Sequence, residues 1–146
     1  MTTSLKLLSL DIDDLAVVSA HMQDAVFKVG DINYATRSGV FTLAANRFVW
    51  EKLKPGEKAF ERRRALLSIK RVQAVRSVGF DRTDKDKVLS LLALRFQQKG
   101  EGPDGVLELV LSGDGMVALD VECIEVQLAD TGGAWETSFK PSHPGN

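Results

Sequence analysis

The sequence predicts a single α+β domain made mainly of antiparallel strands, and three observations predict this class. Apolar and polar residues alternate in about seven short stretches separated by glycine-containing turns, which is the pattern of half-buried strands. Only one stretch, near the N-terminus, repeats its apolar residues at the helical period. The 146 residues, 44% of them hydrophobic, are enough for one core without a metal or disulfide, so we expect residues 1–146 to form one domain.

The helical stretch covers residues 11–25. Its apolar residues Leu15, Val18 and Met22 fall on one face of a helix. Asp11 is placed to cap the N-terminus, and Asp13 lies in the first turn, where a negative charge suits the helix dipole. We expect this helix to pack against the sheet.

Strands are expected immediately after the helix. Phe27–Val29 and Ile32–Tyr34 flank Gly30-Asp31, and this two-residue connection predicts a hairpin because glycine supplies the positive φ of a tight turn. A turn at residues 37–39 then leads into a longer strand, Val40–Trp50.

The middle of the chain predicts one loop and one bend. Residues 52–62 are polar and include a Pro-Gly pair, so we expect the one substantial loop there. After it, the apolar residues have one parity up to Ile69 and the other from Val72, with Lys70-Arg71 at the change. A β-bulge or a bend at this point would keep both sets on the core side.

The second half predicts further strands. Val88–Phe96 is nearly all apolar and is expected to be covered on both faces. Val106–Leu111 and Met116–Val121 form a meander, and Cys123–Asp130 alternates like a strand, although the glycines that follow favour a short C-terminal helix. With the N-terminal helix, these elements favour a curved antiparallel sheet or a small, partly open barrel of the pleckstrin-homology-like kind.

The charge of the chain is divided between two halves. Residues 51–87 hold 12 Lys or Arg against 6 Asp or Glu, and residues 88–146 hold 3 against 9, while the whole chain has a net charge of −1. A field divided in this way can steer a polyanion, an acidic protein or a second copy of the chain.

Catalytic and metal-binding patterns are scarce. His21 has Asp24 three residues later, a spacing that would suit an oriented imidazole, but a packing histidine is the simpler interpretation. The single Cys123 lies between Glu122 and Glu125, which disfavour a reactive thiolate, so we expect it to be buried and structural. No zinc spacing occurs, and we expect neither a metal nor a cofactor.

The candidate binding residues come from two places. The basic segment 58–82 supplies guanidinium groups that suit phosphates and carboxylates equally. In the run Asn46–Glu51, we expect Phe48 and Trp50 to face the core and Arg47 to pair with Glu51 at its edge; a half-exposed Trp50 would instead have the composition of an interface hot spot. The candidates are Arg47, Trp50, Arg62, Arg63, Arg64, Arg71 and Arg76.

Five runs give the chain a resemblance to a known family. They are Asp14–Asp24, Asn46–Glu51, Arg62–Arg64, Arg71–Ser77 and Val121–Asp130. Together they resemble a bacterial family known as domain of unknown function 2948. The resemblance spans nearly the whole chain and implies a cytosolic, single-domain bacterial protein without an assigned activity.

Three functions follow from these patterns. The leading hypothesis is a non-catalytic module that binds a protein partner or self-associates. The alternative is binding of RNA or DNA through residues 58–82, and the third is an enzyme that uses His21 and Asp24. No leader peptide pattern and no apolar window long enough for a membrane span occurs in the sequence, so we expect a cytoplasmic protein with no membrane partner.

Overall fold

The structure is a computed structural model that describes residues 4–52 and 61–136. One α-helix and ten strands make up the described residues, together with two short 3₁₀ helices. The elements are β1 (Lys6–Ser9), α1 (Ile12–Met22), β2 (Ala25–Lys28), η1 (Val29–Asp31), β3 (Ile32–Ala35), β4 (Val40–Phe48), η2 (Trp50–Lys52), β5 (Glu61–Ile69), β6 (Val72–Val78), β7 (Val88–Gln98), β8 (Gly105–Leu111), β9 (Met116–Val121) and β10 (Val126–Glu136).

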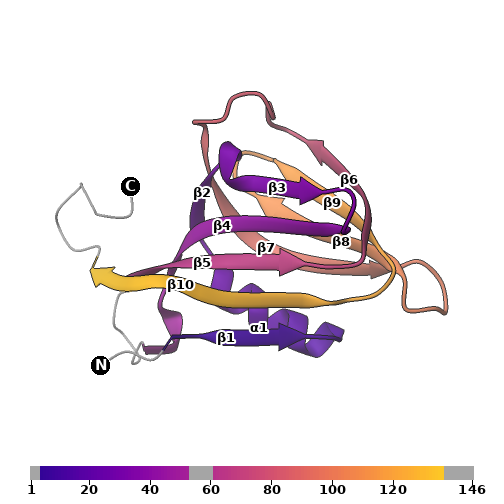
Figure 1. Cartoon of the computed structure of the whole chain (residues 1–146), viewed down its shortest axis with the longest axis horizontal. Coiled ribbons are helices and arrows are strands. Elements are labelled where there is room, and N and C mark those ends of the chain that lie inside the picture. Colours follow the sequence, from indigo (N-terminus) through magenta and orange to yellow (C-terminus); the bar gives the residue numbers. More distant parts are fainter. Residues whose placement is uncertain (1–3, 53–60, 137–146) are drawn as a thin grey trace.

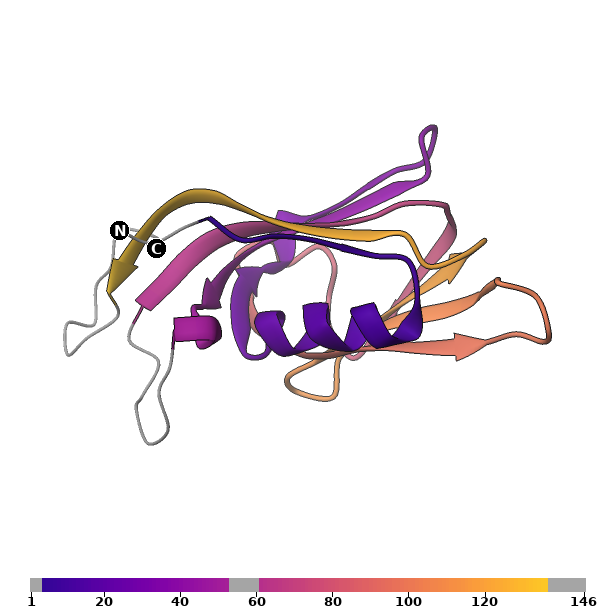
Figure 2. The same cartoon turned by 90° about the horizontal axis from the view of Figure 1, so that it is seen from below.

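All ten strands belong to one antiparallel sheet. The strand order is β1-β10-β5-β4-β2-β7-β8-β9-β6, and β3 pairs with β4 beside β2. The sheet curves so that β10, β5 and β4 form one side and α1 lies on the other side of them (Figures 1 and 2). The predicted antiparallel fold class is therefore confirmed, but the sheet is open, because its end strands β1 and β6 do not pair to close a barrel.

The helix forms where the sequence predicts it. The Asp11 carboxylate accepts a hydrogen bond from Asp14 N at 2.8 Å, which caps the first turn. Leu15, Val18 and Met22 are buried against β1, β4 and β7. This apolar face packs on the concave side of the sheet, against a core that the strands mostly supply.

The strands supply the rest of the core through alternate residues. In β4, Phe41, Leu43 and Ala45 are fully buried, while the residues between them are half-buried. The same alternation runs through β5, β8, β9 and β10. Each strand therefore has one face toward the core and one face outward, as the period of two requires.

The predicted hairpin at Gly30-Asp31 is wrong. β2 pairs with β7 and, at one position, with β4, while β3 pairs only with β4. Val29 N and Gly30 N donate instead to the carbonyl oxygens of Lys87 and Lys85, each at 2.9 Å. The loop before β7 thus accepts hydrogen bonds from the backbone between β2 and β3. The two strands do not pair with each other, and η1 connects them.

The predicted change of direction at Lys70-Arg71 is confirmed. Arg71 adopts a left-handed conformation, with φ of 60°, and the chain leaves β5 to enter β6 at the far end of the sheet. Of the loop expected at 52–62, residues 53–60 lie outside the described residues, and β5 begins at Glu61.

The short C-terminal helix expected within Cys123–Asp130 is also wrong, because β10 occupies this part of the chain from Val126 onward. β10 lies between β1 and β5 and pairs with both, which buries Val126 and Leu128. The glycines that suggested a helix end lie where the β10–β5 register shifts, between Asp130 and Ala134.

The expectation that Val88–Phe96 is covered on both faces is wrong for part of β7. Leu91 and Leu94 are buried in the core, where β7 contacts α1. Leu92 is 43% exposed and Val88 is 55% exposed. The register between β7 and β8 shifts between Leu91 and Ala93, so a bulge turns Leu92 outward.

Candidate interaction surface

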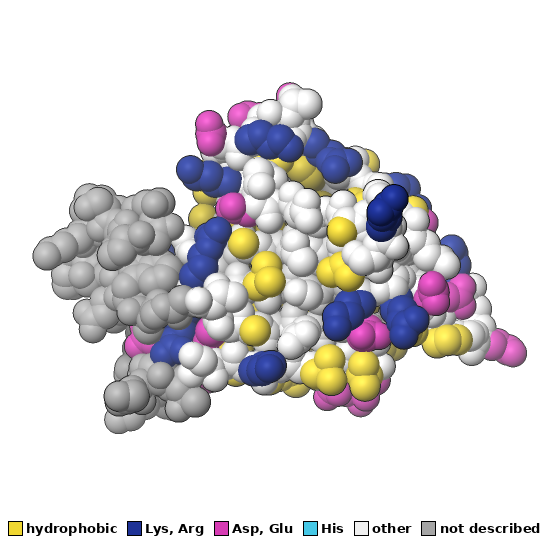
Figure 3. Space-filling model, in the orientation of Figure 1, with side chains coloured by type: hydrophobic (Ala, Val, Ile, Leu, Met, Phe, Trp, Pro, Cys, Tyr) yellow, Lys and Arg dark blue, Asp and Glu magenta, His cyan; other side chains and the backbone are white. Residues whose placement is uncertain are grey.

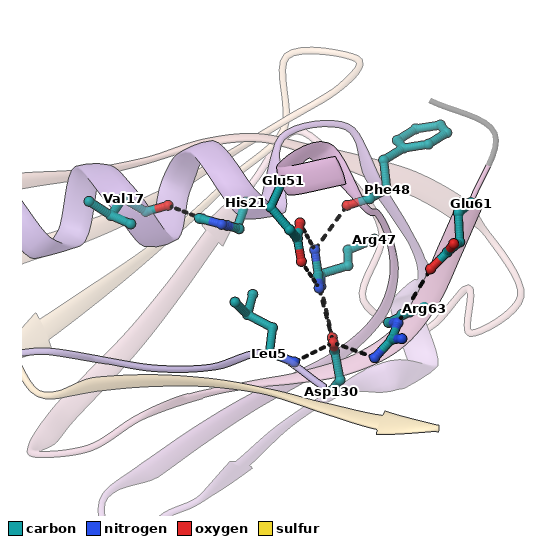
Figure 4. A network of polar contacts seen from close by, with 9 residues as sticks. All are labelled: Leu5, Val17, His21, Arg47, Phe48, Glu51, Glu61, Arg63 and Asp130. Carbon is teal, nitrogen blue, oxygen red and sulfur yellow. Dashed lines mark hydrogen bonds and ion pairs between the residues drawn. The ribbon is translucent and has the colours of Figure 1, made fainter. Parts of the chain in front are cut away.

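A buried ion cluster lies where β4, β5 and β10 meet, and Arg47 is its centre (Figure 4). Arg47 Nε and Nη2 donate to the Asp130 carboxylate at 2.8 and 3.0 Å. Its Nη1 and Nη2 donate to Glu51 at 3.0 and 2.8 Å, and Nη1 also donates to Phe48 O at 3.1 Å. All five guanidinium donors are therefore satisfied within the chain.

Asp130 connects this cluster to the N-terminal strand. Its side chain is fully buried and accepts from Leu5 N at 2.8 Å, and Arg63 Nη1 lies 3.4 Å away. Burial opposes the ionised form, but the bonds from Arg47 and Leu5 outweigh it and lower the pKa of Asp130. The bonds to Asp130 and Glu51 likewise overcome desolvation and raise the pKa of Arg47. The charges of Arg47 and Asp130 are therefore bonded within the chain, and they stabilise the folded structure.

The predicted pair of Arg47 with Glu51 is confirmed, but the predicted orientation of the strand is wrong. Arg47 is fully buried on the core side, whereas Phe48 is half-buried on the outward side. The core side of β4 can hold Arg47 because Asp130 neutralises it, a contact that joins residues 83 positions apart. Trp50 is half-buried, and its indole nitrogen donates to Gln23 O at 3.0 Å.

The outward side of β4, β5 and β10 forms a surface that we call the outer face. Registered strands place one row across Gln127, Ser68 and Thr42, and a second row across Ala129, Leu66 and Ala44. None of these six side chains is charged, and all are half-buried by their neighbours. In Figure 3 the centre of this view carries no charged side chain, and Lys, Arg, Asp and Glu lie toward its margins.

Arg62 and Phe48 pair across β5 and β4 at one end of the outer face, and the Trp50 ring adjoins that of Phe48. The Arg62 guanidinium carbon sits 3.9 Å from the centre of the Phe48 ring, and the Phe48 and Trp50 ring centres are 5.3 Å apart. Arg62 Nε is buried and has no hydrogen-bond acceptor among the described residues. Desolvation lowers the pKa of Arg62. Stacking on Phe48 holds this cation in place.

The remaining candidate arginines are scattered and paired. Arg64 lies 3.5 Å from Asp31 and donates to Asn46, at the margin of the outer face. Arg71 lies 3.3 Å from Glu125, and Arg76 makes two bonds to Asp120 at 2.7 and 3.0 Å. The structure therefore brings Trp50, Arg62 and Arg64 to one end of the sheet, buries Arg47 and Arg63 beneath it, and places Arg71 and Arg76 elsewhere.

The candidate catalytic residues do not form a dyad. His21 Nδ1 bonds to Val17 O at 2.8 Å within α1, and no hydrogen bond joins it to Asp24, although both residues are described. Cys123 is half-buried rather than buried, because it lies in the connection between β9 and β10 at the surface. Within residues 4–52 and 61–136, no cluster of His, Cys, Asp and Glu could hold a metal ion.

Sequence reasoning missed the outer face. Its signal is present in the sequence: residues of even number in β4 and β5 have outward parity, and the ones between Val40 and Asn46 and between Leu66 and Ser68 are uncharged. Recognising it needs the knowledge that β4, β5 and β10 are neighbours, which no local pattern supplies.

These features define an open, curved antiparallel sheet with a helix on its concave side and an uncharged outer face. The chain belongs to the family described as "Protein of unknown function (DUF2948)", whose model matches residues 5–143. No curated protein and no solved structure matches the chain. In the part of the chain that the structure describes, the helices fall short of the length and apolar character needed to cross a membrane.

Proposed function

We propose that this protein is a non-catalytic interaction module that docks on another protein through its outer face. The observation that carries the proposal is the uncharged centre of this face, with the charged side chains at its margins. The centres of protein interfaces are depleted of charged residues, and their rims are polar. Small side chains such as Ala44, Ser68 and Ala129 also keep the surface flat enough for a second protein to approach.

Arg62, Phe48 and Trp50 supply the anchoring groups of the proposed interface. Arginine and large aromatic residues dominate binding energy at protein interfaces. Arg62 is half-buried and stacked on Phe48, and a carboxylate or carbonyl oxygen of a partner would bond to the terminal nitrogens of its guanidinium group. This end of the outer face is the expected centre of binding energy.

The pairing of the basic segment supports a protein partner over a nucleic acid. Arg63, Arg64, Arg71 and Arg76 each lie within 4 Å of a carboxylate of the same chain. Phosphate contacts would have to displace these internal partners. The single cysteine and the bacterial character of the family resemblance support a module that works in the bacterial cytoplasm.

A charge placed at the centre of the outer face tests the proposal. In a lysate of cells that naturally make the protein, the wild-type chain is expected to elute above the 16.0 kDa of a single copy. Ser68→Lys should shift it to the monomer position, because a buried lysine in an interface is left unpaired. Ala20→Lys, on the exposed side of α1, should elute like the wild type. A wild-type chain that elutes as a monomer, or an unchanged Ser68→Lys variant, would refute the proposal.

A further inference from the structure

Two strand edges face one another across an opening in the sheet. Among the described residues, β3 pairs only with β4 and β6 pairs only with β9, so each strand has one edge without a neighbouring strand there. At one end of the opening, Tyr34 Oη donates to Val72 O at 3.0 Å and Val72 N donates to Gly39 O at 2.9 Å. At the other end, the hydrogen bonds of Val29 and Gly30 to the loop before β7 close it. We call the space between these ends the window.

A small pocket lies inside the window, and Ser77, Arg82 and Lys85 join apolar residues in its lining. Ile32 and Tyr34 line it from β3, and Val75 lines it from β6, above the buried side chains of Phe41 and Val117. Its volume of about 30 Å³ exceeds the roughly 10–15 Å³ that one water molecule needs. The pocket can therefore take the end of one short aliphatic side chain.

Two basic side chains line the window, in a loop that also carries the exposed Asp81, Asp84 and Asp86. Arg82 and Lys85 line the pocket, both are exposed, and neither is ion-paired within residues 4–52 and 61–136. No carboxylate is among the lining residues. Arg71 and Arg76 of the same segment are instead paired with Glu125 and Asp120. The lining of the pocket thus carries two positive charges and no negative one.

The edge of β6 is only lightly protected: its register with β9 shifts between Val72 and Ala74, and Arg76 is its one charged residue. The seven residues Val72–Val78 contain no proline and no lysine, and Val78 is 61% exposed. A free edge without proline or lysine, and with the regular stretch Val75–Val78 beyond the register shift, can pair with another strand. An extended peptide that binds a sheet edge gains affinity from main-chain hydrogen bonds and specificity from alternate side-chain pockets.

We propose that the window binds an extended segment of a partner protein, which adds a strand along β6. One short apolar side chain of the segment enters the pocket, and an Asp or Glu one or two residues away meets Arg82 and Lys85. This site is separate from the outer face and does not depend on it.

Selection from a phage library of random eight-residue peptides on the full chain tests this inference. The enriched peptides are expected to carry an apolar residue with Asp or Glu within two positions. A synthetic enriched peptide should bind Arg82→Glu/Lys85→Glu at least about tenfold more weakly than the wild type, measured by fluorescence anisotropy. Both residues are exposed, so circular dichroism of the variant should match that of the wild type.

The matched control is Lys6→Glu/Lys99→Glu, which reverses two exposed lysines that do not line the pocket and should leave the peptide affinity unchanged. Hydrogen exchange with the bound peptide should slow along Val75–Val78 and not along β1. No enrichment, enriched peptides without acidic residues, equal affinity for the Arg82→Glu/Lys85→Glu variant, or protection elsewhere would each overturn the inference. The synthetic peptide reports on the window alone: Ser68→Lys, which changes only the outer face, should bind it as the wild type does, so loss of peptide binding overturns this inference and leaves the outer face untouched.

Discussion

Arg47 shows at the scale of one residue how a charge can belong to a core. Its side chain is fully buried, yet every donor has an acceptor on Asp130, Glu51 or the backbone of Phe48. The pair with Glu51 was predictable because the residues are four apart in one run. The contact with Asp130 was not, because it depends on β4, β5 and β10 assembling in register.

Removing Asp130 is expected to be the most damaging single change in the ion cluster. Asp130→Ala leaves Arg47 and Arg63 buried without their shared carboxylate, and breaking a buried pair in this way costs about 3–5 kcal/mol of unfolding free energy. Glu51→Ala should cost less, because the Glu51 side chain is 30% exposed and water can replace it. Urea denaturation compares the two variants, and an equal or smaller loss for Asp130→Ala would contradict the assigned role.

The same carboxylate predicts how stability depends on pH. Burial alone would raise the pKa of Asp130, but the hydrogen bonds from Arg47 and Leu5 lower it below its ordinary value of 3.8. The folded state therefore binds fewer protons than the unfolded state at acid pH, so stability is full above the unfolded pKa and is lost as the pH falls through the folded pKa. The urea concentration at the midpoint of unfolding should decrease as the pH is lowered below about 4. This decrease should be less steep in Asp130→Asn. Parallel curves for the two proteins would contradict this.

At the scale of elements, tertiary pairing decided the structures that local patterns predicted wrongly. Val126 and Leu128 alternate as in a strand, whereas the glycines after them suggested the end of a helix. This segment is a strand because it pairs with β1 on one side and with β5 on the other. Gly30-Asp31 fits a hairpin turn, but the loop before β7 offers its carbonyl groups to Val29 and Gly30. Helix α1 and the bend at Lys70-Arg71 were predictable because caps and parity are local signals.

Two glycines with positive φ, Gly79 and Gly113, lie in connections between strands, and replacing them by alanine tests how tightly these connections pack. Gly79 has φ of 82°, and a Cβ there would lie 2.5 Å from Asp114 O, whereas Gly113 has φ of 67° with open space around it. Gly113→Ala should lose about 1–2 kcal/mol of unfolding free energy, the cost of a left-handed alanine. Gly79→Ala should lose more, because its methyl group also meets the backbone of the β8–β9 turn. Thermal or urea unfolding measures both losses. Equal losses would contradict the prediction, because they would mean that the β8–β9 turn moves to make room for the methyl group.

At the scale of the whole molecule, the divided charge of the sequence pairs within the chain. β6 lies beside β9 and β5 beside β10, which brings Arg76 to Asp120 and Arg63 to Asp130. The basic middle and the acidic tail are therefore neighbours in the sheet. The sequence predicts the charge asymmetry, but only the strand order reveals that its first partner is internal.

Internal pairing predicts weak binding to nucleic acids. Fluorescence anisotropy with labelled single-stranded DNA or RNA at physiological salt should give a dissociation constant weaker than about 100 μM, the weak end of non-specific binding. Micromolar affinity that falls steeply with salt, and that weakens in Arg71→Ala/Arg76→Ala, would instead favour phosphate contacts by the basic segment. Arg63 is unsuitable for this comparison, because its loss would disturb the ion cluster.

Photo-crosslinking in living cells shows whether the outer face contacts another protein. A photoreactive amino acid at position 68, at the centre of the face, is compared with the same amino acid at position 20 on the exposed side of α1. We expect a discrete adduct from position 68, with either a partner protein or a second copy of the chain. The adduct should be absent from position 20. Adding Arg62→Ala should make the adduct from position 68 at least about tenfold weaker. No adduct from position 68, or the same adducts from both positions, would contradict it.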